Sequence, residues 1–187
     1  MGRIIAAGIA AGVALFIWGA VEHMMTPIGE MGITGHPHEA MLLPAIQQTT
    51  PQPGLYMFPS LDRSKSPTKE DEQAYIEKFK SGPHGILILG PTGDDPMPPS
   101  RLAKELFANV LTAIVAAFLL AKFATGLGGF VSGGIMTFLI GWMSISVPSW
   151  NWYDFPAPFV LAELIDQLAS GAIVGLVVGL MLRRKRT

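Results

Sequence analysis

Four long stretches of this chain are almost free of charged side chains, and this pattern limits its fold more than any other feature. A membrane hydrocarbon core is about 30 Å thick, so a helix needs about 20 apolar residues to cross it. The sequence therefore predicts an all-α membrane fold, a bundle of four transmembrane helices at residues 4–21, 106–121, about 130–147 and about 159–182.

The first stretch, IIAAGIAAGVALFIWGAV, is expected to remain in the mature protein as a membrane anchor. Its apolar run is longer than the hydrophobic core of a typical secretory signal peptide. Trp18 also stands where a cleavage site requires a small residue. We therefore expect a retained helix rather than a cleaved leader.

The positions of the charges predict how the helices cross the membrane. If both termini face the cytoplasm, the residues on that side include no acid and six bases, which are Arg3, Lys122, Arg183, Arg184, Lys185 and Arg186. The other side then holds the remaining seven bases and all fourteen acids, so the two sides carry net charges of +6 and −7. Lysine and arginine in short loops and tails favour the cytoplasmic side. We therefore expect cytoplasmic termini.

Composition agrees with a membrane protein and excludes several kinds of site. Only 14% of the residues are charged, whereas soluble domains average about 25%. The absence of cysteine excludes disulfides, thiolate zinc sites, iron–sulfur clusters, a cysteine nucleophile and C-x-x-C-H haem attachment. The net charge of −1 gives no general attraction to nucleic acid. We expect the lipid bilayer as a partner, with no nucleic acid and no cofactor.

The acidic residues of the helices are expected to mark the edge of the bilayer rather than its interior. The seventeen residues from Asp166 to Leu182 span about 25 Å of helix, and the basic cluster follows directly. The same count places Glu22 about 28 Å from Arg3, and Glu105 stands at the corresponding end of the second span. With no ionisable group expected near the midplane, the pattern argues against a proton relay or a secondary transporter.

Residues 26–100 are too polar and too rich in proline for a membrane, and we expect them to form a small extracytoplasmic α/β module. The chain thus divides into a first transmembrane helix (1–25), this module (26–100) and three further transmembrane helices with a cytoplasmic basic tail (101–187). Ser66 as N-cap, Pro67 as first residue and Gly82 as stop predict a helix in the module.

The remaining elements of the module follow from local patterns. The predicted helices lie at about 67–80 and at about 38–49, the latter interrupted or kinked at Pro44. Two apolar runs between turn signals predict strands at 54–59 and 85–90.

Small residues recur every four positions in each span and are expected to pack the helices against one another within one chain. These sets are Gly8 and Gly12; Ala113, Ala117 and Ala121; Gly133, Thr137 and Gly141; and Gly171, Gly175 and Gly179. Glu163 and Gln167 continue the last set, so we expect this polar pair to face the bundle. Homo-oligomerisation is the less favoured alternative.

The segment VPSWNWYDFPAPF, between the third and fourth spans, is expected to form a rigid turn at the outer surface. Tryptophan and tyrosine are enriched at the level of the lipid headgroups. An interfacial aromatic belt is therefore favoured over a hot spot for binding a partner.

One group of side chains near the outer interface is a candidate ligand site. Glu22, His23, Glu163 and Asp166 would form a polar cluster if the first and last spans are neighbours. Such a cluster could bind a cation, a lipid headgroup or a quinone, with His23 as the group that titrates near neutral pH. We favour the alternative that these residues are polar helix ends, hydrogen-bonded at the headgroup boundary.

His36 and His38, in GHPHEA, raise the separate question of a metal site with Glu39. Histidines at i and i+2 share a face in a β-strand. Here Pro37 separates them at the start of a predicted helix, so we expect the two rings to diverge. We favour helix capping and solvated histidines over metal binding.

The motifs of the main hydrolase and nucleotide-binding classes are missing from the sequence. GPTGDD lacks the Lys-Ser/Thr ending of a phosphate-binding loop, and neither G-x-S-x-G nor H-E-x-x-H occurs. We therefore expect no enzyme, and a membrane enzyme that uses His36 or His38 is the last of our hypotheses.

The succession FIWGAVEHMM, GLYMFPS, GPHGILIL and PMPPSRLAKELFANVL, with the further spans after it, resembles a group of small bacterial four-span inner-membrane proteins with a periplasmic loop domain. The resemblance covers most of the chain. It implies a bacterial inner (cytoplasmic) membrane and a periplasmic module, and it implies no activity and no catalytic residue.

Two functions are consistent with these patterns. The first is a non-catalytic accessory or scaffold subunit of a larger membrane complex, with other membrane protein subunits as partners. The second is a ligand-binding or transport-related membrane protein with a cation, lipid or quinone site at the outer interface.

Overall fold

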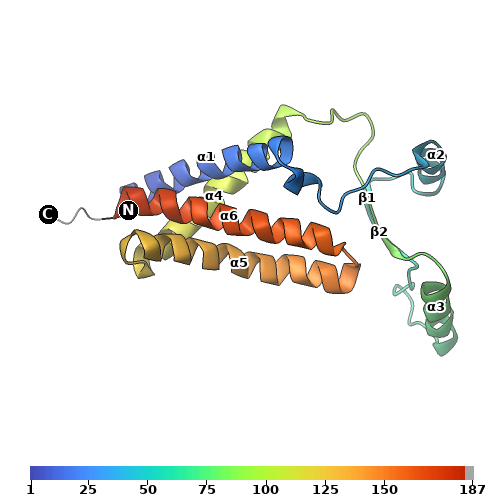
Figure 1. The fold of residues 1–187 in the computed structure, drawn as a ribbon. Helices are drawn as coiled ribbons and strands as arrows, with labels where there is room; N and C mark the ends of the chain where they lie inside the picture. Colours follow the sequence, from blue (N-terminus) through green and yellow to red (C-terminus); the bar gives the residue numbers. More distant parts are fainter. Residues whose placement is uncertain (184–187) are drawn as a thin grey trace. The chain divides into compact units, whose positions relative to one another are not determined.

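Four long apolar helices dominate the computed structural model, which describes residues 1–183 (Figure 1). They are α1 (Gly2–Met25), α4 (Pro99–Phe123), α5 (Gly126–Tyr153) and α6 (Ala157–Leu182). Each is long and apolar enough to cross a membrane. The prediction of a multi-pass helical membrane protein is confirmed at this level. The rest of the predicted basic tail, residues 184–187, lies outside the described residues.

The chain divides into two compact units. The helical unit comprises Met1–Thr34 and the chain from Asp95 onward, and the second unit comprises Gly35–Asp94. After α1 the chain forms the short 3₁₀ helix η1 (Pro27–Glu30), which packs on α1 and α6. Gly32 follows with a φ of 77° and lies so close to Phe159 of α6 that a side chain would not fit. These contacts keep residues 26–34 with the helices.

Within the helical unit the helices are neighbours in the order α4, α1, α6, α5 (Figure 1). α1 packs against both α4 and α6, and α5 packs along α6. α4 and α5 make little contact, although only Ala124 and Thr125 separate them in the sequence. The two helices therefore diverge from this short link and leave a groove between them.

Glycines bring α5 and α6 into backbone contact. A Cβ atom on Gly171 would lie 2.7 Å from the carbonyl oxygen of Gly134, so a side chain there would push the helices apart. Close packing of this kind is what holds apolar helices together in lipid. Trp142 of α5 adds a hydrogen bond, because its Nε1 donates to the carbonyl of Val160 at 3.0 Å.

The packing strip expected for the third span holds only in part, because Gly133 packs against α4 but Gly141 meets no neighbouring helix. Gly134, and not the set of Gly133, Thr137 and Gly141, meets the glycines of α6, while a Cβ on Gly141 would touch nothing within 4 Å. Adjacent helical positions differ by about 100° in direction, so a shift of one residue changes the partner. Gly133 faces the Leu120 side chain of α4 instead.

Pro148 does not end α5, which continues to Tyr153. Much of the expected aromatic turn is therefore helical, and the link to α6 is reduced to Asp154, Phe155 and Pro156. A proline inside a helix removes one backbone hydrogen bond, which transmembrane helices tolerate when other groups compensate. Asp154 ends the helix in the left-handed conformation, with φ 56° and ψ 31°.

The second unit contains two helices and a two-stranded sheet whose strands are separated in the sequence by one of the helices. These elements are α2 (Glu39–Thr49), β1 (Gly54–Phe58), α3 (Lys69–Ser81) and β2 (Gly85–Leu89). The strands pair antiparallel, with Gly54 opposite Leu89 and Phe58 opposite Gly85. α2 continues through Pro44 as one helix.

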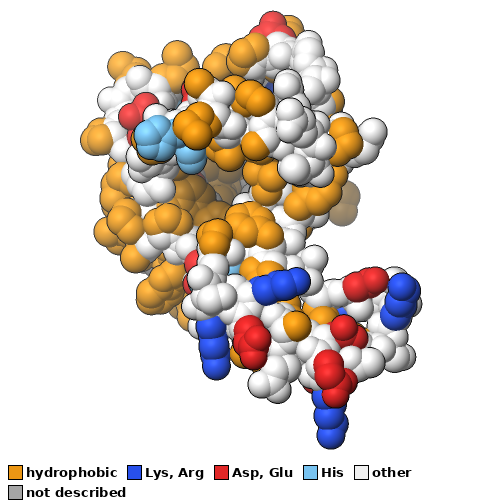
Figure 2. Space-filling view, turned by 90° about the vertical axis from the view of Figure 1, so that its right-hand side faces the viewer, with side chains coloured by type: hydrophobic (Ala, Val, Ile, Leu, Met, Phe, Trp, Pro, Cys, Tyr) orange, Lys and Arg blue, Asp and Glu red, His pale blue; other side chains and the backbone are white. Residues whose placement is uncertain are grey.

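The predicted start of α3 is wrong by two residues. Thr68 is the N-cap instead of Ser66, and its hydroxyl accepts from the N–H of Asp71, whose carboxylate accepts from the N–H of Thr68. The acid three residues after the cap makes this reciprocal pair, whereas Lys69 occupies that position relative to Ser66. Charged side chains of both signs gather where α3 lies, at the bottom of the view in Figure 2.

Candidate functional site

A cavity of about 330 Å³ opens among the four long helices near the acid-bearing end of the helical unit. We call it the acidic cavity. It is lined by Leu15, Trp18, Gly19, Glu22, His23, Glu105, Asn109, Thr112, Phe138, Asp166, Gln167 and Ser170. The set combines three carboxylates with four further polar side chains of the amide and hydroxyl kinds.

Glu22 is the most deeply buried of these acids. Only 3% of its surface is exposed, and its carboxylate contacts Nδ1 of His23, whose own side chain is 73% exposed. Position 22 belongs to the last turn of α1, and Thr26 secures that turn by donating to the Glu22 carbonyl at 2.8 Å. The buried carboxylate of Glu22 is thus paired with His23, whose exposed side chain lies at the edge of the cavity.

Asp166 joins α6 to α1 across the cavity. Its Oδ1 accepts from Nε1 of Trp18 at 2.7 Å and from the hydroxyl of Ser170 at 3.3 Å. Its Oδ2 accepts from the amide of Gln167 at 3.1 Å. The first and last spans are therefore neighbours, which is the condition that the candidate cluster required.

The α4 wall carries polar groups that the sequence analysis did not include in the cluster. Glu105, Asn109 and Thr112 follow one another at spacings of four and three, so they share a helix face. Asn109 donates from its amide to Glu105 at 3.0 Å. This spacing was visible in the sequence, but nothing there indicated that α4 would adjoin α1.

The structure brings Glu22, His23 and Asp166 to one cavity, whereas Glu163 does not line it. Glu163 is half-buried on α6, near enough for the charges of Asp166, Glu22 and His23 to act on it. Glu163 is thus close to the site without facing into it.

The acidic cavity offers mainly hydrogen-bond acceptors and negative charge. None of its described lining residues is lysine or arginine, and the amide and indole N–H groups of Trp18, Gln167 and Asn109 already donate to its carboxylates. Within residues 1–183 no group of three or more His, Asp or Glu is arranged to hold a metal ion. A complementary ligand would therefore donate hydrogen bonds and carry positive charge.

An apolar groove of about 360 Å³ lies between α4 and α5 and shares part of its wall with the acidic cavity. We call it the α4/α5 groove. Its lining residues are Leu111, Thr112, Val115, Ala116, Thr137, Phe138, Gly141 and Gln167, of which Thr112, Phe138 and Gln167 also line the acidic cavity. Residues 111–116 lie about 9–16 Å along α4 from Glu105, so the groove extends from the cavity towards the middle of the helices.

His36 and His38 lie outside this arrangement, in the second unit. Their ring centroids are 6.4 Å apart with an edge-to-face angle of 70°. Nδ1 of His36 accepts from the backbone N–H of His38 at 3.1 Å, and His38 occupies the N-cap position of α2 without a side-chain capping bond. The two rings thus lie near each other at the exposed start of α2, so the expectation that they diverge is wrong, and the His38 side chain does not cap the helix.

Comparison with known proteins finds no matching family model, no matching curated protein and no matching solved structure.

Proposed function

We propose that this chain is a non-catalytic membrane protein that binds an amphipathic molecule. A cationic amine head would occupy the acidic cavity and an apolar tail would occupy the α4/α5 groove. The observation that carries the proposal is the shared wall of Thr112, Phe138 and Gln167. Of the two hypotheses drawn from the sequence, ligand binding therefore comes before the role of an accessory subunit.

The choice of an amine head follows from the acceptors of the cavity. An ammonium group has three donors and no acceptor, so it would complement a cavity that is lined by the carboxylates of Glu22, Glu105 and Asp166. A quinone head offers only carbonyl acceptors and would face the carboxylates unfavourably. A bare cation would leave the α4/α5 groove without a role.

The proposal includes a membrane orientation. We expect a bacterial inner membrane, cytoplasmic termini and a second unit on the extracytoplasmic side, as a small α/β module. The support is the division of charge between the two ends of the helices. In this orientation the acidic cavity opens near the outer leaflet.

A comparison of two lipids tests the proposed ligand class. The full chain, purified in mild detergent, would be titrated with phosphatidylethanolamine and with phosphatidylcholine of identical acyl chains, and bound lipid would be counted by native mass spectrometry. We expect the primary amine to bind about tenfold more tightly than its trimethyl counterpart, because only the former donates hydrogen bonds. Equal binding of the two lipids, or preferential binding of a quinol, would contradict the amine proposal.

Substitution of one glutamate at a time tests whether the amine lipid binds in the acidic cavity. Glu22→Gln should weaken binding of the amine lipid about tenfold, since it removes the buried charge while keeping the shape. Glu77→Gln is the matched control, because Glu77 lies on the exposed surface of α3 in the second unit. If both variants bound equally well, the acidic cavity would not be the site.

A role as an accessory or scaffold subunit is the second candidate, and the exposure of α5 favours it. In an 18-residue apolar stretch of each helix, only 11% of the residues of α5 are buried, against 33% of those of α6. Gly141 lines the groove and has open space where a side chain would stand. Small open residues allow a partner helix to approach closely. Isolation of the monomer alone from every mild detergent and lipid nanodisc would count against this role. Loss of a co-purifying subunit in Gly141→Leu, but not in Gly128→Leu, would support it.

A further inference from the structure

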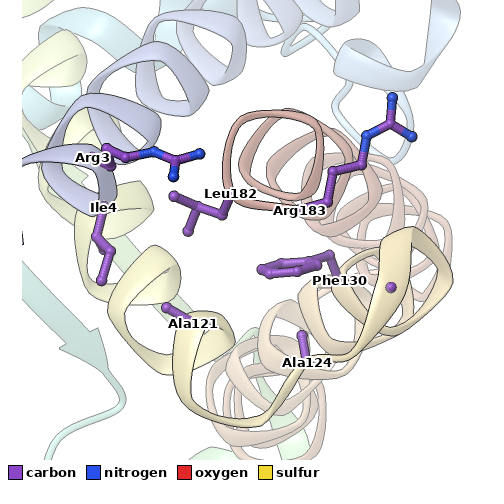
Figure 3. A pocket seen from close by; sticks show the side chains of 8 residues that line it. Arg3, Ile4, Ala121, Ala124, Phe130, Leu182 and Arg183 are labelled. Carbon is purple, nitrogen blue, oxygen red and sulfur yellow. The ribbon is translucent and has the colours of Figure 1, made fainter. Parts of the chain in front are cut away.

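A third cavity lies at the other end of the helical unit, where α1 and α5 begin and α4 and α6 end (Figure 3). We call it the basic cavity, and its volume is about 570 Å³. Arg3 and Arg183 stand at its rim, and Ile4, Ala121, Phe130 and Leu182 contribute apolar walls. It combines positive charge with apolar surface in one recess.

Arg3 is fixed in position by the end of α6. Its Nη2 donates to the carbonyl of Met181 at 2.9 Å, one of the last-turn carbonyls that have no partner within their own helix. In Figure 3 the guanidinium extends from α1 across the opening towards Leu182. A guanidinium has five N–H donors, so this one bond orients the group and leaves it able to bind an anion.

No acidic residue lies near this end in the sequence. Residues 1–21, 106–153 and 167–187 contain neither aspartate nor glutamate, while Lys122 adds a further positive charge at the end of α4. The charge at the mouth of the basic cavity is therefore positive and not offset by acids of these segments.

Small residues keep the cavity open on the side of the α4–α5 link. Ala121 is exposed, and Ala124 and Gly126 follow it in the lining. Gly126 has a φ of 64°, which a residue with a side chain rarely adopts. The tight link therefore turns the chain without placing a bulky group over the recess.

We propose that the basic cavity binds the phosphate of an anionic phospholipid, with the start of an acyl chain against Phe130 and Ile4. Arginine matches phosphate oxygens in geometry and charge, and anionic lipids attract basic residues at the membrane surface. The apolar walls favour a lipid over free phosphate, which has nothing to place there. This site is independent of the amine site at the other end.

The first test compares three ligands on the full chain in mild detergent, with binding measured by native mass spectrometry. Phosphatidylglycerol should bind about tenfold more tightly than phosphatidylcholine with the same acyl chains, and glycerol phosphate should fail to compete at similar concentrations. Equal binding of the two lipids would overturn the proposal. Competition by glycerol phosphate as strong as that of the lipid would also overturn it, because the site would then recognise phosphate alone.

The second test separates a defined site from general attraction to the basic tail. Arg3→Gln and Arg186→Gln each remove one positive charge from the side of the membrane that the charge pattern predicts to be cytoplasmic, although the two positions are at opposite ends of the sequence. We expect Arg3→Gln to weaken phosphatidylglycerol binding about tenfold and Arg186→Gln to change it less than twofold. Equal losses in the two variants would show diffuse attraction and would refute the site.

A third variant guards against a folding defect in Arg3→Gln. Ala121→Leu keeps every charge and fills the recess from an exposed position of α4. It should reduce phosphatidylglycerol binding while the protein unfolds at an unchanged denaturant concentration. Undiminished binding in a folded Ala121→Leu protein would rule out the basic cavity as the binding place.

Discussion

Trp18 and Asp166 form a side-chain hydrogen bond across 148 residues of sequence, and both residues line the acidic cavity. The sequence placed Glu22, His23, Glu163 and Asp166 in one candidate cluster because all four stand at helix ends of the same side, and the cavity includes all of them except Glu163. The candidate cluster did not include Trp18, which the sequence analysis considered only as a bulky residue at a possible cleavage site. Only the pairing of α1 with α6 gives its N–H a specific acceptor.

Replacement of Trp18 by phenylalanine should destabilise the fold by about 1 kcal/mol, the usual size of an interhelical hydrogen bond in a membrane protein. The change keeps an aromatic ring and removes the donor to Asp166. Unfolding of the purified protein in denaturing detergent would measure the loss. Trp152→Phe is the control, since Trp152 is 75% exposed and should leave the stability unchanged. A loss of the same size in both variants would contradict a specific role for Trp18.

Whole helices were easier to predict than the faces that they present. Hydropathy located all four spans, because runs of about 20 apolar residues have few other uses. The contact face of α5 could not be fixed, because Gly133 and Gly134 both lie among small residues and only packing against α6 decides between them. The length of α5 was also underestimated, because Pro148 is a helix-ending signal in water and a tolerated one in a membrane.

Gly171→Ala tests the close contact of α5 and α6. Since the added methyl group would lie 2.7 Å from the Gly134 carbonyl oxygen, we expect a loss of about 1–3 kcal/mol in stability. Gly141→Ala is the matched control, because a Cβ there meets nothing within 4 Å, and the better helix propensity of alanine should leave stability equal or slightly higher. Detergent unfolding of the two variants would show the difference. An unaffected Gly171→Ala protein would mean that the helices can separate at little cost.

The start of α3 should respond to acid. The backbone N–H and then the hydroxyl of Thr68 hold the pKa of Asp71 below its ordinary value of 3.8, because both bonds favour the ionised carboxylate. A carboxylate of lowered pKa stabilises the folded state above its unfolded pKa, and this contribution is lost as the pH falls through the folded value. The first turn of α3 should therefore loosen below about pH 4.

Backbone Cα chemical shifts of residues 69–73, recorded by NMR on the full chain in micelles between pH 7 and pH 2.5, would follow this change. In Asp71→Asn the dependence on pH should largely disappear, because the residue no longer titrates. A first turn that stays equally helical throughout the titration in the unmodified protein would show that the capping pair contributes little.

The charged residues are divided between the two predicted sides of the membrane, with six bases and no acid on one side and seven bases with all fourteen acids on the other. The proposed orientation follows from this division. The absence of cysteine makes the test direct, because each introduced thiol would be the only one in the chain. In intact spheroplasts, a membrane-impermeant maleimide should label Ser66→Cys in the second unit and should not label Thr187→Cys. After the membrane is opened, both should react. Labelling of Thr187→Cys alone in intact spheroplasts would show that the orientation is the opposite of the one proposed.

The position of α1 between α4 and α6 has a consequence for biosynthesis. α1 precedes both of its partners in the sequence, because 73 residues separate its end from the start of α4, and α6 follows α4 and α5. Until α4 has been made, Glu22 and Trp18 lack the α4 wall, and until α6 has been made they lack Asp166. We therefore expect the contact of α1 with α6 to form only after α6 has been made, with the polar end of α1 exposed until then.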